Sequence, residues 1–259
     1  MWPCWRNGLQ RCEFKKPMND QELNQLLIQR YGSMSSPGGR LRWTIYSLWK
    51  RLLWQVVVAS SHFIKRSFDI VASGIALLLM SPLLGFVALL IKLEDRGPII
   101  FAQRRVGKFG REFKMYKFRS MRVDAEQVLQ KLLAQNTHAT GVTFKMKNDP
   151  RVTRIGRILR KYSLDELPQF VNVLKGEMSI VGPRPPVPRE VALYTLQDRQ
   201  RLAVTPGLTC FWQIGGRANI DFPEQVQLDV QYIESQSFWL DVWICIKTIP
   251  AALLGKGAC

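Results

Sequence analysis

The pattern of hydrophobic positions is dominated by one uncharged stretch, which runs for 22 residues from Ile70 to Ile91. As a single helix it would be about 33 Å long, enough to cross the hydrocarbon core of a bilayer. Ser81-Pro82 lies at its midpoint, and a proline inside a helix removes one backbone hydrogen bond and kinks or breaks the helix. The stretch therefore predicts a membrane helix with an interruption at Ser81-Pro82.

Basic residues flank both ends of this stretch, with Lys65-Arg66 before it and Lys92 and Arg96 after it. Because positively charged flanks favour the cytoplasmic side of a membrane, both ends are expected on that side. A re-entrant helix over about residues 66–95, which enters, breaks at Ser81-Pro82 and returns, satisfies this condition. The Ser81 hydroxyl is expected to bond a freed backbone group. A full transmembrane span is the alternative.

Two further segments have the pattern of helices that lie in a membrane surface. Residues 43–64 carry aromatic and aliphatic side chains at roughly helical spacing, with basic residues between them. Phe238–Leu254 is rich in tryptophan and poor in charge, and Pro250 interrupts it. An ordinary core-facing helix is the alternative for residues 43–64. Residues 1–42 are polar and predict an N-terminal arm without chemistry of its own.

Between these segments the pattern changes to short runs. Phe101–Met121 alternates around a glycine-containing turn, which predicts a β-hairpin with strands Ile99–Arg105 and Glu112–Phe118. Ile155–Tyr162 is expected to form a helix with one basic face, and residues 190–203 a further helix.

The expected fold is therefore α+β and predominantly helical. It combines a re-entrant membrane hairpin, interfacial amphipathic helices and a small β-hairpin or sheet around the site. Three regions are expected: an arm at 1–42, an interfacial helix at 43–64 and a membrane-embedded domain at 65–259.

Composition narrows the class of partner. The formal net charge is +17, which favours nucleic acid, anionic lipid headgroups or phosphorylated substrates. The aromatic residues cluster in the membrane segments and do not interleave with the basic residues, which argues against nucleic acid. Five scattered cysteines suit a reducing compartment, and two histidines away from any cysteine pair make a zinc site improbable. The N-terminus lacks the apolar core of a signal peptide.

Candidate chemistry gathers at an acidic pair, Asp165-Glu166, which lies between a basic run and the loop Pro183–Pro186. Carboxylates among crowded cations suggest phosphate chemistry, in which the cations hold the anion and a carboxylate attacks it or holds a metal. Ser163-x-x-Glu166 is also a capping box, which is the structural alternative. Pro168 fits a helix that starts at Asp165 better than one capped by Ser163.

Six ordered blocks, from about Lys65 to the C-terminus, resemble the bacterial sugar transferase family, the monotopic polyprenyl-phosphate glycosyl-1-phosphate transferases. The blocks are Lys65-Arg66-x-x-Asp69, Ser81-Pro82, Gly97-Pro98-x-x-Phe101-x-Gln103-x-Arg105-x-Gly107, Lys117-Phe118-Arg119-Ser120-Met121, Ser163-Leu164-Asp165-Glu166-Leu167-Pro168-Gln169 and Gly182-Pro183-Arg184-Pro185. The absence of a multi-span segment before them matches the small form of the family.

The resemblance implies an enzyme that transfers a sugar-1-phosphate from a UDP-sugar to undecaprenyl phosphate and releases UMP. This is a first membrane step of exopolysaccharide or glycan assembly, at the cytoplasmic face of the bacterial inner membrane. Asp165 is then expected to form a covalent phospho-sugar intermediate, and Glu166 to hold Mg²⁺. The expected substrate-binding cations are Lys117, Arg119, Arg160, Arg184 and Arg217. A homo-oligomer is compatible with this assignment.

The chain departs from the family pattern at Cys210, where a glycine is usual, and at Gly215, where a polar residue is usual. Both departures concern the sugar pocket, so the sequence leaves the sugar open. The alternative function is a non-catalytic, membrane-anchored basic protein that binds polyanions or acts as an assembly partner. The intact Asp165-Glu166 pair argues against an inactive relative.

Overall fold

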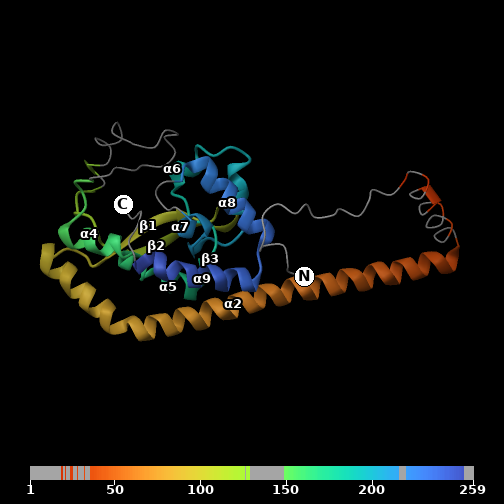
Figure 1. Cartoon of the computed structure of the whole chain (residues 1–259), viewed down its shortest axis with the longest axis horizontal. Coiled ribbons are helices and arrows are strands. Elements are labelled where there is room, and N and C mark those ends of the chain that lie inside the picture. The colour runs from red at the N-terminus through yellow and green to blue at the C-terminus, as the bar shows by residue number, and fades with distance from the viewer. Residues whose placement is uncertain are drawn as a thin grey trace. The chain divides into compact units, whose positions relative to one another are not determined.

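The computed structural model describes residues 36–125, 127–128, 149–215 and 220–253, with six single positions between 19 and 32. The chain divides into two compact units, Met1–Ser60 and Ser61–Cys259. Most of the described residues are helical, and the strands are short, as the expected α+β class requires (Figure 1).

Helix α2, Pro37–Asp95, is the longest element and contains Pro82. The carbonyl that loses its partner to this proline is that of Leu78, four residues earlier. The Ser81 hydroxyl donates to this carbonyl at 2.8 Å, so the prediction that it bonds a freed group is confirmed. The helix stays continuous through Ser81-Pro82 and bends in its golden part (Figure 1).

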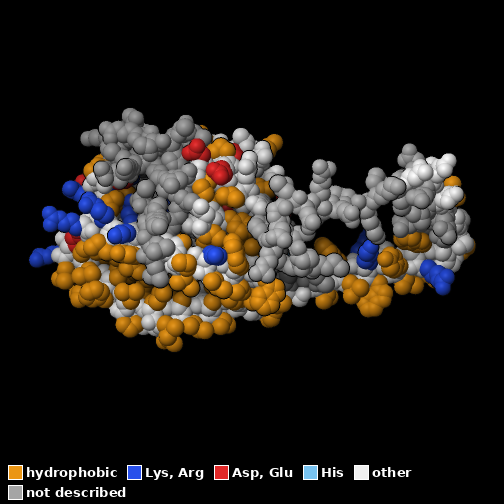
Figure 2. All heavy atoms as spheres, in the orientation of Figure 1, with side chains coloured by type: hydrophobic (Ala, Val, Ile, Leu, Met, Phe, Trp, Pro, Cys, Tyr) orange, Lys and Arg blue, Asp and Glu red, His pale blue; other side chains and the backbone are white. Residues whose placement is uncertain are grey.

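The apolar part of α2 is mostly uncovered by the rest of the described chain. His62–Asp95 is long and apolar enough to cross a membrane; its most apolar window of 18 residues has a mean hydropathy of 2.5, and only 11% of that window is buried. Hydrophobic side chains gather along the lower edge of the Ser61–Cys259 unit, where α2 lies (Figure 2). The exposed members on α2 include Ile70, Ile75, Leu78, Leu79 and Phe86.

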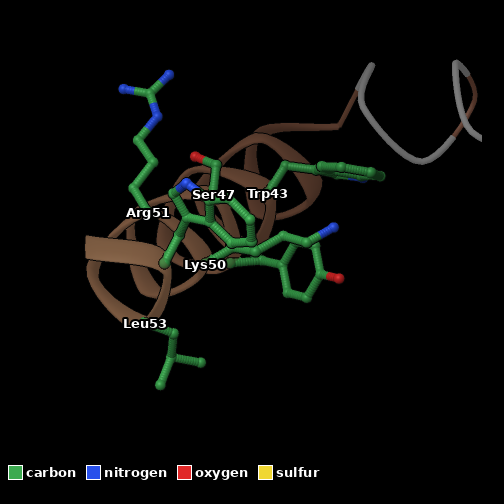
Figure 3. Close-up of a pocket in the computed structure, with 7 residues that line it drawn as sticks. Trp43, Ser47, Lys50, Arg51 and Leu53 are labelled. Atoms are coloured by element: carbon green, nitrogen blue, oxygen red, sulfur yellow. The ribbon is translucent and has the colours of Figure 1, made fainter. Parts of the chain in front are cut away.

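The Met1–Ser60 unit contains a hollow of about 620 Å³ beside the first turns of α2 (Figure 3). The Lys50 Nζ atom lies 5.7 Å from the centroid of the Tyr46 ring, and Trp43 packs edge-on against the same ring at 5.9 Å. The lining residues are Trp43, Tyr46, Ser47, Lys50, Arg51, Leu53 and Trp54. The hollow contains no predicted site residue, and the interfacial role of residues 43–64 stays a prediction.

The predicted β-hairpin is confirmed. Strand β1, Ile100–Val106, pairs antiparallel with β2, Glu112–Phe118, through the 3₁₀ turn η1, Lys108–Gly110. Phe109 and Gly110 both have left-handed backbone angles, φ 56° and φ 79°, which close the turn.

A second sheet of two parallel strands was not predicted from the sequence. It pairs β3, Ser179–Val181, with β4, Gly207–Thr209. The strands approach very closely, because a Cβ atom on Gly207 would lie 2.0 Å from the Gly182 nitrogen. Only glycine permits such backbone contact.

The remaining elements are short helices that pack around these strands. They are α4 (Arg154–Lys161), η3 (Leu164–Glu166), α5 (Gln169–Lys175), α6 (Pro188–Val191), η4 (Asp198–Leu202), α7 (Phe211–Gly215), α8 (Phe222–Ser235) and α9 (Phe238–Leu253). The predicted basic helix corresponds to α4. The prediction of one helix over residues 190–203 is wrong. Helix α6 ends at Val191, and the rest of this range contains only the 3₁₀ turn η4.

Helix α9 continues through Pro250 to Leu253, so the expected interruption is wrong, and its place in a membrane surface stays a prediction. Ile244 and Asp241 are buried against the core, whereas Trp239 is 72% exposed and Ile246 is 61% exposed. The main core lies between α9 and β3, and its buried members are Met115, Val173, Met178, Ile180, Val181, Tyr232 and Ile244.

A second cluster joins the end of α2 to the hairpin. Val87 and Ile91 of α2 pack with Phe118 of β2 and Leu159 of α4. The end of α2 therefore lies beside β2, which carries Lys117 and is followed by Arg119, and beside α4, which carries Arg160.

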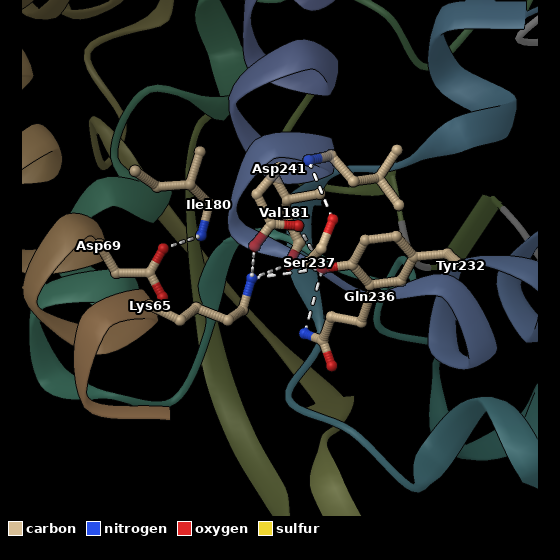
Figure 4. A network of polar contacts seen from close by, with 9 residues as sticks. Lys65, Asp69, Ile180, Val181, Tyr232, Gln236, Ser237 and Asp241 are labelled. Atoms are coloured by element: carbon tan, nitrogen blue, oxygen red, sulfur yellow. Dashed lines mark hydrogen bonds and ion pairs between the residues drawn. The ribbon is translucent and has the colours of Figure 1, made fainter. Parts of the chain in front are cut away.

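A polar network fixes the start of the apolar part of α2 to this core (Figure 4). The Lys65 ammonium donates to the Val181 carbonyl at 3.1 Å and to the Tyr232 hydroxyl at 3.2 Å, and it pairs with Asp241. The Tyr232 hydroxyl donates to Asp241 at 2.7 Å. Asp241 is only 2% exposed, so its charge depends on Lys65 for compensation.

Arg66 and Asp69, the other two polar residues of the block Lys65-Arg66-x-x-Asp69, also bond α2 to neighbouring elements. Asp69 accepts a hydrogen bond from the Ile180 N–H at 3.0 Å, also visible in Figure 4. Arg66 donates to the carbonyls of Val173 and Leu174 in the last turn of α5, where carbonyls lack a partner four residues later; the Val173 carbonyl also accepts from the Gly176 N–H. Lys65, Arg66 and Asp69 therefore join α2 to the rest of the Ser61–Cys259 unit.

Candidate active site

The acidic pair lies on the tight turn η3, between α4 and α5. Ser163 precedes the turn with φ 56°, in the left-handed region, and its side chain makes no capping hydrogen bond. The capping-box interpretation of Ser163 and Glu166 is therefore wrong. Pro168 immediately precedes α5, where its missing N–H has no helical partner to lose.

Glu166 is held by two cations from different parts of the chain. Its Oε1 atom accepts a hydrogen bond from Arg184 at 2.8 Å and from Lys117 at 3.3 Å. Burial alone would raise the pKa of Glu166, but the charges of Arg184 and Lys117 outweigh it and lower this pKa to about 2. Glu166 is therefore a carboxylate at neutral pH.

Asp165 has the opposite electrostatic environment, although it is the adjacent residue. It is 8% exposed, and burial, together with the charge of Glu166, raises its pKa above the ordinary value. The charges of Lys117, Arg160 and Arg184 oppose this rise. Neighbouring carboxylates with pKa values pushed apart are typical of sites that assign them different roles.

Lys117, at the end of β2, completes this cluster. Burial lowers its pKa to about 8; the charge of Glu166 opposes the shift and that of Arg184 adds to it. It is thus a cation that begins to lose its proton just above neutral pH.

Arg160 lies close enough to Asp165 for its charge to act on this carboxyl, whereas Arg119 pairs with an acid outside the site. The Arg160 Nε atom donates to the Ser120 hydroxyl at 2.9 Å, and its charge acts on Asp165. Arg119 is 6% exposed and pairs with Asp95 at the end of α2. Arg217 lies outside the described residues.

The sequence reasoning missed Arg105 as a site residue. Its Nη1 atom donates to the Pro185 carbonyl at 2.8 Å, and its other nitrogens bind the Gln103 Oε1 atom at 2.7 and 3.1 Å. Burial and the charge of Arg184 lower the pKa of Arg105 to about 10. The available signal was strand alternation, which places Gln103 and Arg105 on the same face of β1.

The described residues contain no group of three His, Cys, Asp or Glu side chains able to hold a metal ion. Glu166 is the acid whose placement suits a shared ion, because both of its cationic partners contact Oε1. Its Oε2 atom accepts no hydrogen bond within the described ranges.

Comparison with known proteins identifies the family of the chain. A family model described as bacterial sugar transferase matches residues 60–255. The chain belongs to the bacterial sugar transferase family. The match contains η3, β2 and the Pro183–Pro186 loop, and it begins close to Lys65.

Three curated relatives illustrate the similarity. The galactosyl transferase CpsE of Streptococcus agalactiae serotype III is 52% identical over 76% of this chain and 44% of its own length. The exopolysaccharide production protein ExoY of Rhizobium meliloti is 45% identical over 75% of this chain and 87% of its own. The undecaprenyl-phosphate galactose phosphotransferase of Salmonella typhimurium is 44% identical over 77% and 42%. The chain thus spans less than half of two relatives and most of the third.

Proposed function

We propose that this bacterial sugar transferase moves a sugar-1-phosphate from a UDP-sugar to undecaprenyl phosphate, giving a polyprenyl-diphosphate-sugar and UMP. The observation that carries the proposal is the Asp165-Glu166 pair, held among Lys117, Arg160 and Arg184 within the family match. The name of the Salmonella relative supports the lipid acceptor, and two relatives' names support galactose as the first sugar to test. The product would serve exopolysaccharide or glycan assembly.

The reaction is proposed to run in two steps through Asp165. A carboxylate oxygen of Asp165 attacks the phosphorus that bears the sugar, the bond from this phosphorus to the bridging oxygen breaks, and UMP leaves. An oxygen of the lipid phosphate then attacks the same phosphorus and releases the Asp165 carboxylate. Covalent catalysis suits a soluble donor and a membrane-bound acceptor, because the two need not bind together.

The raised pKa of Asp165 fits this role. A more basic carboxylate is a better nucleophile, and Lys117, Arg160 and Arg184 favour its ionised form. The same cations would reduce the repulsion between Asp165 and the diphosphate. Arg119 and Arg217 remain proposed substrate contacts.

Glu166 is the proposed protein ligand of Mg²⁺. Magnesium usually takes one or two protein carboxylates and completes its shell with water and substrate phosphate, so a single ionised Glu166 fits it. When bound, the ion would neutralise diphosphate charge. Lys117 and Arg184 meanwhile hold Glu166 by Oε1, which leaves Oε2 for the metal.

The membrane placement is part of the proposal. Asp165 must reach a phosphate at headgroup level, and a re-entrant α2 that bends at Ser81-Pro82 would hold the domain at that depth on the cytoplasmic face. The Ser81 hydroxyl bond to Leu78 supports a bend that costs little inside lipid. The exposed face of α9 and residues 43–64 would lie in the interface, against anionic headgroups.

The test is UMP release by detergent-solubilised protein with Mg²⁺ and a panel of UDP-sugars, without and with undecaprenyl phosphate. Lipid-dependent release by the wild type, lost in Asp165→Asn, is the expected result. A stoichiometric burst without lipid is expected from the covalent step. Equal release by Asp165→Asn would refute the aspartyl nucleophile, and no release with any UDP-sugar would refute the proposed donor class.

A further inference from the structure

The loop Pro183–Pro186, which carries Arg184, cannot be held in place by its own backbone donors. Proline has no N–H group, so Arg184 supplies the only amide hydrogen of these four residues. The loop places the Arg184 side chain on Glu166. It must therefore be held by donors that bond its carbonyl oxygens and by packing of its proline rings.

Three of the four loop carbonyls accept a hydrogen bond from outside the loop. Two of these come from backbone N–H groups and one from a side chain. The bonds are Gly207 N–H to Pro183 at 2.8 Å, Val106 N–H to Pro186 at 2.9 Å and Arg105 Nη1 to Pro185 at 2.8 Å. The end of β1 thus holds the half of the loop that follows Arg184, and β4 holds the half before it.

We call these three donors the clamp. Arg105 is the only side chain among them, so its hydrogen bond can be removed by a substitution that leaves the backbone unchanged. Its orientation is fixed by Gln103, whose Oε1 atom accepts from both Nε and Nη2 at 3.1 and 2.7 Å. This leaves Nη1 directed at the Pro185 carbonyl. A guanidinium held at two nitrogens has little freedom to search for another partner.

The charges of Arg105 and Arg184 also favour the observed position of Arg184. Arg105 and Arg184 lie close enough for the charge of Arg184 to lower the pKa of Arg105. Because Arg105 is committed to Gln103 and Pro185, mutual repulsion favours the position in which Arg184 is directed at Glu166, where it bonds at 2.8 Å.

We propose that Arg105, oriented by Gln103, is a positioning residue that fixes Arg184 for binding the donor diphosphate. It acts through the Pro185 carbonyl and touches neither reacting atom. The role in donor binding rests on the proposed function, whereas the clamp on the loop does not.

The clamp can be tested without turnover. The amides of Val106 and Gly207 donate to the carbonyls of Pro186 and Pro183, so hydrogen–deuterium exchange at these two amides reports on the order of the loop. Arg105→Met is expected to speed this exchange by about tenfold or more, since it removes a hydrogen bond from a charged donor. Arg104→Met is the matched control, because Arg104 is the next residue on β1 and is exposed. Equal exchange in both variants would overturn the clamp.

The kinetic arm separates positioning from a loss of folding. Arg105→Met is expected to lower kcat/KM by about 10- to 100-fold, chiefly through a higher KM for the UDP-sugar, with partial rescue in Arg105→Lys. In an Arg184→Met background the same change should cost little more, because its target is gone. Fully additive losses, or an effect no larger than that of Arg104→Met, would refute the positioning role. A wild type that releases no UMP, with faster exchange in Arg105→Met, would refute the proposed function and leave the clamp standing.

Discussion

We expect Lys117 to make the activity of this transferase sensitive to mild alkali. Burial lowers the pKa of Lys117 to about 8, so its ammonium is about nine-tenths charged at pH 7 and about one-tenth charged at pH 9. If the charged form is needed beside Glu166, kcat/KM should fall by about tenfold between these two pH values. An ordinary lysine would cause no change in this range, because it titrates near pH 10.5.

The decisive variant is Lys117→Arg. Arginine stays protonated far above pH 9, so the alkaline fall should disappear even where the variant is slower at pH 7. Lys114→Arg is the matched control, since Lys114 lies on the same strand and is exposed, and it should keep the wild-type profile. UMP release would be measured at low substrate from pH 6.5 to 9.5 against blanks without enzyme. An alkaline limb that persists unchanged in Lys117→Arg would refute the reasoning.

The effect of Lys117 on stability has the opposite pH dependence to its effect on activity, which separates unfolding from a loss at the site. Between about pH 8 and pH 10.5 the unfolded chain keeps the Lys117 proton and the folded chain has lost it. The contribution of Lys117 to the free energy of unfolding therefore rises with pH in this window. A Tm that holds while kcat/KM falls would assign the loss to the site.

Three further changes test other parts of the structure. Glu166→Gln should raise the Mg²⁺ concentration needed for half-maximal UMP release by at least about tenfold, because a neutral amide is a poor Mg²⁺ ligand; an unchanged Mg²⁺ dependence would remove Glu166 as a ligand. Asp241→Ala leaves the Lys65 ammonium without its counter-charge and should lower the free energy of unfolding by about 3 kcal/mol, measured by thermal unfolding in detergent; Asp241→Asn, which keeps a hydrogen-bond acceptor, should lose less. Gly207→Ala forces a Cβ to within 2.0 Å of the Gly182 nitrogen and should destabilise the chain by about 1–3 kcal/mol or more; a wild-type Tm would contradict the close strand contact.

The sequence predicted the elements whose pattern is long enough to repeat. The apolar stretch of α2, the hairpin and the basic helix α4 each present several turns or alternations, and the structure has them. The sheet of β3 and β4 could not be found in this way, because each strand has three residues and pairs through backbone next to glycine. Its partners are also far apart along the chain.

The site was predictable in its residue types but only partly in its contacts. Lys117 and Arg184 were expected as substrate-binding cations of the site that contains Glu166, but their direct contacts with Glu166 were not predicted. Arg119 was expected at the substrate, and the structure pairs it with Asp95. This pair could not be predicted, because Asp95 is the last residue of α2 and its position depends on where that helix ends. Ser163 had the spacing of a helix cap, but a left-handed backbone angle turns the chain before its hydroxyl can serve.

The contacts of Lys65 and Asp69 have a consequence for how this enzyme would respond to bilayer thickness. Both side chains hold β3, through Val181 and Ile180, at the point where α2 continues into its apolar part. Beyond β3 the chain leads directly into the loop that carries Arg184. A change in the tilt of α2 must therefore carry β3 and the loop with it. If α2 lies in the bilayer as proposed, a thinner or thicker bilayer would therefore raise or lower β3 and this loop together with the helix.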